Sequence, residues 1–241
     1  MKFDVRSTLI PIFALMALLL NHPAHSDGVV VDKIYHPYIE AMEQEIEWRS
    51  VWQDQQPGQE NNRVLSRLAY GRSFGDRWFG EAYLVFAEST ERSLELEGYE
   101  LEVRHQLTEQ GQYWADWGVI MELEKEDGAD IWEFSSGLIV EKELGRWSAT
   151  ANALVIQEWG SDIDDELEST LALQTRYRFK PYLEPALEFH SGQDTKAFGP
   201  AMQGNLRLGI RRNLHWEMGF LFGLDSESPD TSIRAGLEYE F

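Results

Sequence analysis

The sequence predicts an all-β protein, an antiparallel up-and-down transmembrane β-barrel of about 12 strands, with ten strands as the alternative count. Three observations support this. Side chains alternate between apolar and polar in segment after segment, short turns alternate with longer polar loops, and the chain begins with an export signal. We assign residues 1–26 to the signal peptide, 27–41 to an N-terminal segment and 42–241 to the barrel.

The first residues have the layout of a secretory signal. Lys2 and Arg6 precede an apolar run over residues 9–20, and Ala24 and Ser26 are the small residues that a signal peptidase recognises. The apolar run is short against the roughly 20 residues that cross a bilayer as a helix. We therefore expect cleavage after Ser26 and export to the periplasm, with a retained anchor as the alternative.

Composition excludes several kinds of protein. The chain has no cysteine, so neither a disulfide nor a lipid on an N-terminal cysteine can form. Its 21 basic and 42 acidic residues give a formal net charge of −21, which argues against a nucleic-acid partner. The sequence has no glycine-rich phosphate loop and no histidines at metal-ligand spacing, so we predict no cofactor and no dedicated metal site.

The strands are predicted from a period of two, which is weak in one segment and persuasive when repeated. The clearest segments are 99–104, 113–123, 132–140, 147–155, 167–177, 206–210, 214–224 and 233–241, and weaker ones surround 46–48, 64–70, 78–86 and 183–189. Two places strain this pattern. Pro185 lies inside a predicted strand and is placed near the periplasmic rim or at a bulge. The apolar phase changes at Gly98, which predicts a β-bulge.

The predicted connections alternate in length, as in outer-membrane barrels. Short turns are expected at 75–76, 109–111, 144–146, 180–181 and 212–213, and longer external loops at 54–62, 88–93, 125–130, 160–166, 193–201 and 225–231. An aromatic residue follows each short turn, and we expect these residues to form a girdle at the periplasmic membrane boundary: Trp78, Tyr113, Trp147, Tyr182 and Trp216.

The faces opposite the lipid-facing residues are rich in charge, so the interior cannot be a dry apolar core. The lumen-facing candidates are Glu47, Arg49, Arg67, Glu81, Glu100, Glu102, Arg104, Glu122, Glu133, Glu141, Glu158, Arg176, Arg178, Glu184, Glu188, His190, Arg207, Arg211, Glu217, Arg234 and Glu238. Two interpretations remain open. Either the charges pair and fill the lumen, or the excess carboxylates line a narrow water-filled path that prefers cations.

The predicted external loops are acidic as well. Asp162, Asp164 and Asp165 lie in one of them, and Asp127 and Asp130 in another. Their oxygens are suited to divalent cations, which would bridge the loops to anionic lipopolysaccharide. The alternative is a solvated acidic face without a bound ion.

Two segments resemble known proteins. The last five residues, with Tyr239 and the terminal Phe241, resemble the C-terminal signal by which Gram-negative outer-membrane proteins engage the barrel-assembly machinery. Residues 36–49, HPYIEAMEQEIEWR, are similar to an uncharacterised proteobacterial outer-membrane β-barrel family. The resemblance implies the barrel, an outer-membrane location and contact with membrane lipid, and it carries over no catalytic residue.

We therefore expect a protein without enzymatic activity. His190 and Ser191 are neighbours on a strand and point to opposite faces, so a direct nucleophile–base contact is not expected. The leading hypothesis is a passive barrel with a narrow cation-preferring route for small solutes. The alternatives are a closed barrel whose acidic loops contact lipopolysaccharide and, less favoured, a lipid-acting enzyme. Residues 27–41 are expected at the periplasmic mouth, with a lumen plug as the other placement.

Overall fold

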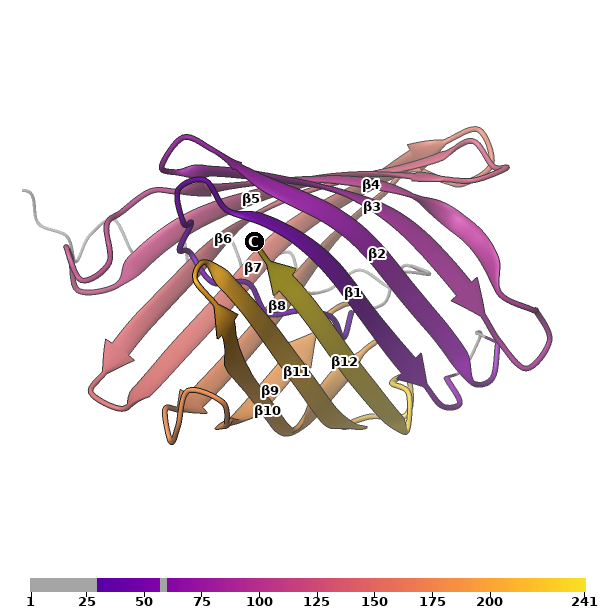
Figure 1. Cartoon of the computed structure of the whole chain (residues 1–241). Coiled ribbons are helices and arrows are strands. Elements are labelled where there is room, and N and C mark those ends of the chain that lie inside the picture. The colour runs from indigo at the N-terminus through magenta and orange to yellow at the C-terminus, as the bar shows by residue number, and fades with distance from the viewer. Residues whose placement is uncertain (1–29, 57–59) are drawn as a thin grey trace, which may run out of the picture.

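The computed structural model describes residues 30–56 and 60–241, and the predicted signal peptide lies outside the described residues. Twelve antiparallel strands form a closed barrel in which each strand pairs with its neighbours in sequence and β1 pairs with β12 (Figure 1). The strands are β1 (Gln44–Gln53), β2 (Arg63–Phe74), β3 (Trp78–Glu88), β4 (Glu95–Gln106), β5 (Asp116–Glu126), β6 (Ile131–Leu144), β7 (Trp147–Gly160), β8 (Glu166–Tyr177), β9 (Glu184–Ser191), β10 (Lys196–Gly209), β11 (Arg212–Gly223) and β12 (Thr231–Glu240). Among the described residues, no helix has the length and apolar character needed to span a bilayer.

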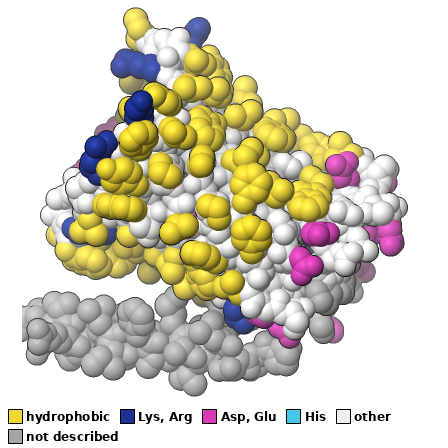
Figure 2. All heavy atoms as spheres, turned by 90° about the horizontal axis from the view of Figure 1, so that it is seen from below, with side chains coloured by type: hydrophobic (Ala, Val, Ile, Leu, Met, Phe, Trp, Pro, Cys, Tyr) yellow, Lys and Arg dark blue, Asp and Glu magenta, His cyan; other side chains and the backbone are white. Residues whose placement is uncertain are grey.

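The period-two pattern corresponds to two faces of the sheet. In β3, Phe79, Glu81 and Tyr83 are buried, whereas Trp78 and Leu84 are 43% and 40% exposed. On the face shown in Figure 2, large apolar side chains are spread over the outer surface, most Lys and Arg lie toward one end, and Asp and Glu lie toward the other. The antiparallel barrel and its strand number are therefore as the alternation predicts.

We name the two ends of the barrel by their connections. The turn end carries the β2–β3, β4–β5, β6–β7, β8–β9 and β10–β11 connections, and the loop end carries the others. The turn predicted at 212–213 is wrong by two residues, because β11 already begins at Arg212 and the turn is formed by Ile210 and Arg211. Arg211 has a left-handed φ of 57°, a conformation in which Asn is more usual, so the sequence pattern favoured Asn213 instead.

The long loop predicted over 193–201 is also wrong, since β10 begins at Lys196. The Gly199–Pro200 pair suggested a turn. In the structure Gly199 is buried and Pro200 exposed within a regular ladder, and Pro200 pairs with Leu187 of β9. Pro185 lies near the turn-end start of β9 opposite Met202, as predicted.

The β-bulge predicted at Gly98 is confirmed, because the β3–β4 register shifts there and skips Glu97. Closure of the barrel depends on the last strand. Trp48 of β1 faces Leu237 of β12, and the backbone N–H of Phe241 donates to the carbonyl of Gln44 over 2.8 Å. The rings of Tyr239 and Phe241 stack with centroids 5.7 Å apart. Pairing of the two terminal strands leaves no open sheet edge.

Candidate functional site

Residues 30–43 run through the lumen to the turn end, where β1 begins. Lys33 donates to Glu47 of β1 and, over 2.9 Å, to Glu238 of β12. On the far wall, Asn152 of β7 accepts from the backbone N–H of Tyr35 over 2.7 Å and donates to its carbonyl over 2.9 Å. From the sequence, the periplasmic mouth is favoured for this segment, with a lumen plug as the other placement; the structure places residues 30–43 between opposite walls of the lumen, as in the second of these. We call residues 30–43 the lumen segment.

The lumen segment stays tied to the wall toward the turn end. His36 Nδ1 lies 2.6 Å from a carboxylate oxygen of Glu141, and the hydroxyl of Tyr38 donates to Asp116 over 2.9 Å. The segment also supplies apolar contacts, because Val31 packs with Val51 and Leu221, and Tyr35 packs with Ile120 and Ile139. The lumen segment therefore occupies part of the interior that a barrel of this width encloses.

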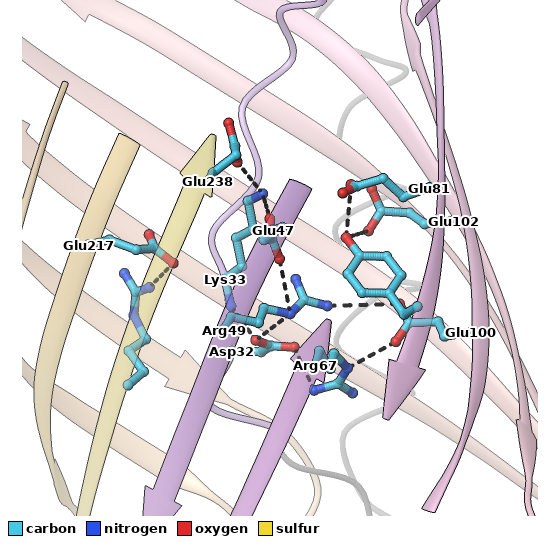
Figure 3. A network of polar contacts seen from close by, with 12 residues as sticks. Asp32, Lys33, Glu47, Arg49, Arg67, Glu81, Glu100, Glu102, Glu217 and Glu238 are labelled. Carbon is cyan, nitrogen blue, oxygen red and sulfur yellow. Dashed lines mark hydrogen bonds and ion pairs between the residues drawn. The ribbon is translucent and has the colours of Figure 1, made fainter. Parts of the chain in front are cut away.

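A network of charged side chains surrounds Asp32 and Lys33 of the lumen segment (Figure 3). Asp32 lies 3.4 Å from Arg49 and 3.2 Å from Arg67, and Arg67 donates to Glu100 over 2.9 Å. The ring of Tyr35 has Arg49 at 6.0 Å and Arg104 at 5.7 Å from its centroid. These contacts join the segment to β1, β2 and β4 by charge as well as by packing.

A second buried cluster lies on β9, β11 and β12. The guanidinium of Arg234 binds both carboxylate oxygens of Glu188, over 2.9 and 2.5 Å, and lies 2.6 Å from Glu217. Gln174 donates to Glu188 over 2.8 Å, and His190 lies 3.6 Å from it. This bidentate arrangement fixes one wall of the lumen.

The structure brings most of the predicted lumen residues into ion pairs, namely Glu47, Arg49, Arg67, Glu81, Glu100, Glu102, Arg104, Glu141, Arg176, Arg178, Glu184, Glu188, His190, Glu217, Arg234 and Glu238. Glu122 accepts from Tyr35 and Ser135, and Glu133 and Glu158 line a cavity. Arg207 and Arg211 are exposed at the turn end and do not join the network.

Carboxylates stand in register on five neighbouring strands near the loop end. Glu100 of β4 faces Glu124 of β5, which faces Glu133 of β6, and the series continues through Glu158 of β7 to Glu166 of β8. We call these five residues the glutamate row. Like charges directly opposite one another destabilise a sheet. Each glutamate–glutamate contact in the row is therefore unfavourable, and a nearby cation offsets it, as Arg67 does for Glu100.

Four members of the glutamate row, Glu100, Glu124, Glu133 and Glu158, line a vestibule open to the loop end. It consists of two neighbouring cavities of about 180 and 110 Å³ that share Arg67, Glu124 and Glu133 in their walls. The deeper cavity ends against Tyr35 of the lumen segment. Arg67 lies 3.9 Å from Glu124, and among the described residues Glu133 forms no ion pair with a basic group.

The acidic loops are partly engaged with one another. Asp162 accepts the backbone N–H of Asp130 over 2.7 Å, and Asp130 accepts that of Ser161 over 3.3 Å. The hydrogen bonds from Ser161 hold the pKa of Asp130 below its usual range. Asp164 and Asp165 remain exposed to solvent.

The predicted girdle residues lie at the turn end, and all but Tyr113 lie in the kind of element that the sequence predicts or beside it. Trp78 stacks on His105 with centroids 4.0 Å apart, and Trp147 contacts Tyr177 at 4.8 Å. Tyr182 is exposed in the β8–β9 connection and Trp216 is half-buried in β11. Tyr113 was assigned to a strand, but β5 begins only at Asp116, so Tyr113 lies in the β4–β5 connection.

The residues that sequence reasoning missed belong to the lumen segment and its partners. Asp32 and Lys33 are the charged pair in an otherwise apolar stretch, and this was the one available signal. Asn152 carried no signal, because an inward asparagine on a strand is unremarkable without its partner. His190 lies in the lumen wall, as expected, and is 1% exposed, whereas Ser191 is the last residue of β9 and pairs with Lys196.

No family model matches the chain, and no curated protein matches it. Its fold is similar to solved barrels. The KdgM porin in complex with disordered oligogalacturonate is 14% identical, with a TM-score of 0.55, over 82% of this chain and 99% of that chain. An outer membrane channel from Pseudomonas putida F1 is 15% identical, with a TM-score of 0.58, over 87% and 98%. The β domain of the Bordetella autotransporter BrkA is 17% identical, with a TM-score of 0.52, over 84% and 100%. The chain therefore has the fold of outer-membrane porin and channel barrels.

Proposed function

We propose that this protein is an outer-membrane barrel of a Gram-negative bacterium whose lumen gives a narrow, cation-preferring route for small solutes. The vestibule at the loop end is its external entrance, and the lumen segment closes the route in the middle. The likeness in fold to a porin and a channel supports this class of function, as does the apolar outer surface. Export through the periplasm follows from the predicted signal peptide.

The glutamate row is the observation that carries the cation preference. Four carboxylates of the row line one vestibule, and among the basic contacts to them are Arg67 with Glu100 and Glu124 and Arg49 with Glu100 at 3.8 Å. A cleft lined by charge of one sign between low-dielectric walls raises the local concentration of counter-ions. Rings of carboxylates act in this way in cation channels.

Recordings in planar bilayers with a KCl gradient test the proposal. Wild-type protein is compared with a variant that lacks residues 30–41. We expect the deletion to raise the conductance and the reversal potential to indicate preference for K⁺ over Cl⁻. The double variant E124Q/E133Q in the deletion background should lose part of that preference. E91Q, which neutralises an exposed carboxylate in the β3–β4 connection, is the matched control. Absence of conductance in both the wild-type and the deletion protein would remove the transport function.

A second candidate is a closed structural barrel whose acidic loops contact lipopolysaccharide through divalent cations. The filled middle of the lumen and the exposed Asp164 and Asp165 favour it. Binding of lipopolysaccharide that is abolished both by a chelator and by D164N/D165N would support this function. Binding that survives both treatments would exclude it.

A further inference from the structure

Lys33 lies between two carboxylates on neighbouring strands that would otherwise repel each other. Glu47 and Glu238 stand directly opposite in the β1–β12 pair, at the seam where the barrel closes. The ammonium group of Lys33 hydrogen-bonds to both (Figure 3). Because like charges opposite one another destabilise a sheet, this ammonium offsets an unfavourable contact. Lys33 belongs to the lumen segment, however, and not to the wall.

Two further carboxylates converge on the same place. Oxygens of Glu45, Glu47 and Glu81 lie within 4.8 Å of one another, and these side chains are 1%, 2% and 4% exposed. Among the described residues, no hydrogen-bond donor reaches Oε1 of Glu81, and the nearest cation to Oε1 of Glu45 is Arg104 at 3.9 Å. We call Glu45, Glu47, Glu81 and Glu238 the ammonium ring. It has unfilled acceptors, and the cations that contact its four carboxylates are Lys33, Arg104 and Arg49, which lies 3.6 Å from Glu47.

The ring matches the chemistry of a primary ammonium group. Such a group has three donors that point in different directions, whereas a guanidinium presents a flat fork. Arg104 already serves Glu81 and Glu102 from one side, at 3.4 and 2.8 Å. The ring of Tyr35 lies 5.9 Å from the ammonium nitrogen of Lys33 and adds a weak attraction for a cation.

Departure of the lumen segment would remove the ammonium group that joins Glu47 and Glu238 and leave Arg49 and Arg104 as the remaining cations of the ring. A buried charge that loses its partner is strongly destabilising, so another cation of the same chemistry has a large drive to enter. The wall itself therefore carries the recognition, and Lys33 is its occupant when the barrel is closed.

We propose that the ammonium ring is a binding site for solutes with a primary ammonium group on an alkyl chain, and that Lys33 occupies this site in cis. Such solutes compete with Lys33 and thereby loosen the lumen segment. The inference rests on the proposed cation route and names the class of cation that it selects.

Complementation by a small amine tests recognition at the ring. The variant K33A lacks the three outer methylenes and the ammonium of lysine, which n-propylammonium can replace. We expect K33A to lower the unfolding temperature of the full mature protein in detergent. Propylammonium should restore about half of the loss or more at saturation, because it binds only the folded state. Propanol should restore none, and K196A, which removes an exposed lysine paired with Asp225, should show no recovery. Equal recovery with propanol, or none with the amine, would overturn the proposal.

A second measurement keeps Lys33 in place and applies if K33A does not fold. Ile34 is 2% exposed and the chain has no cysteine, so I34C gives a single buried thiol. Its labelling by a methanethiosulfonate reagent reports exposure of the lumen segment. Propylammonium should accelerate labelling, and NaCl at the same ionic strength should not. An unchanged rate contradicts competition for the ring.

The two measurements separate the ammonium site from transport. Both work on a barrel that conducts nothing. Missing conductance with intact amine effects would remove the route and leave the site, whereas cation-selective conductance without amine effects would leave the route and remove the site.

Discussion

The middle of the lumen and the vestibule at its loop end use the same residue types in opposite ways. In the middle, carboxylates meet basic or hydrogen-bonding partners, as Glu188 and Glu217 meet Arg234 and Glu141 meets His36. In the vestibule, glutamate faces glutamate across strand after strand. Paired charges hold side chains in place, whereas carboxylates that face one another in register attract cations from solution. The comparison separates the residues that fill the lumen from those on which the proposed cation preference rests.

The largest change in stability is expected at Arg234, which pairs with two carboxylates in the middle of the lumen. R234M removes the partner of Glu188 and Glu217, whose side chains are buried in the same wall. We expect a loss of about 3–5 kcal/mol in the free energy of unfolding, since carboxylates remain buried without a partner. Urea titration followed by tryptophan fluorescence measures it. The vestibule variant E133Q is the contrast, with a change of less than about 1 kcal/mol and toward greater stability, because repulsion in the row falls. Equal losses in the two variants would refute the distinction.

A smaller effect is expected where the lumen segment is held. Asn152 is 1% exposed and makes both hydrogen bonds to the backbone of Tyr35. N152A leaves a buried donor and acceptor unpaired, which costs about 1–3 kcal/mol. Hydrogen exchange should show faster exchange in the lumen segment and little change in the strands. N205A, at an exposed position on β10, is the control. Protection of the segment that is unchanged in N152A would show that other contacts hold it.

The smallest effect concerns the acidic loops. Hydrogen bonds from Ser161 lower the pKa of Asp130 from its ordinary 3.8, so the stabilisation that Asp130 provides is present above that value. It is lost as the pH falls through the lower pKa of the folded state. In the wild type, the exchange rate of the Ser161 amide, corrected for intrinsic rates, should rise as the pH falls through this range. D130N should show no such pH dependence, and a similar profile in both proteins would contradict the assignment.

Local patterns predicted the wall of the barrel well and its connections less well. The phase change at Gly98 identified a bulge, because a bulge alters which residues face out, and this is visible along one strand. The loop predicted over 193–201 was wrong, because Gly199 and Pro200 are residue types that often end strands but are tolerated inside a ladder at suitable positions. The turn at Ile210 and Arg211 was also misplaced in the prediction, because a positive φ is uncommon for arginine.

The candidate site was predictable in its charges and not in its contacts. Glu47, Arg49 and Glu238 were placed on the inner face from alternation alone, and the structure buries Glu47 and Arg49 almost completely. The role of Lys33 was not predictable, because its partners lie 14 and 205 residues away in sequence. The alignment of the glutamate row was also hidden, since it depends on the register of four strand pairs.

The sequence by itself determined an exterior of apolar side chains, an interior of charged ones and the number of strands, because a period of two is a local property of the chain. Only the tertiary structure decided that residues 30–43 enter the lumen, that five glutamates stand in one row and that Lys33 bridges the seam of the barrel. These features arise from strand register and from contacts across the lumen, which join residues far apart in sequence and leave no periodic trace.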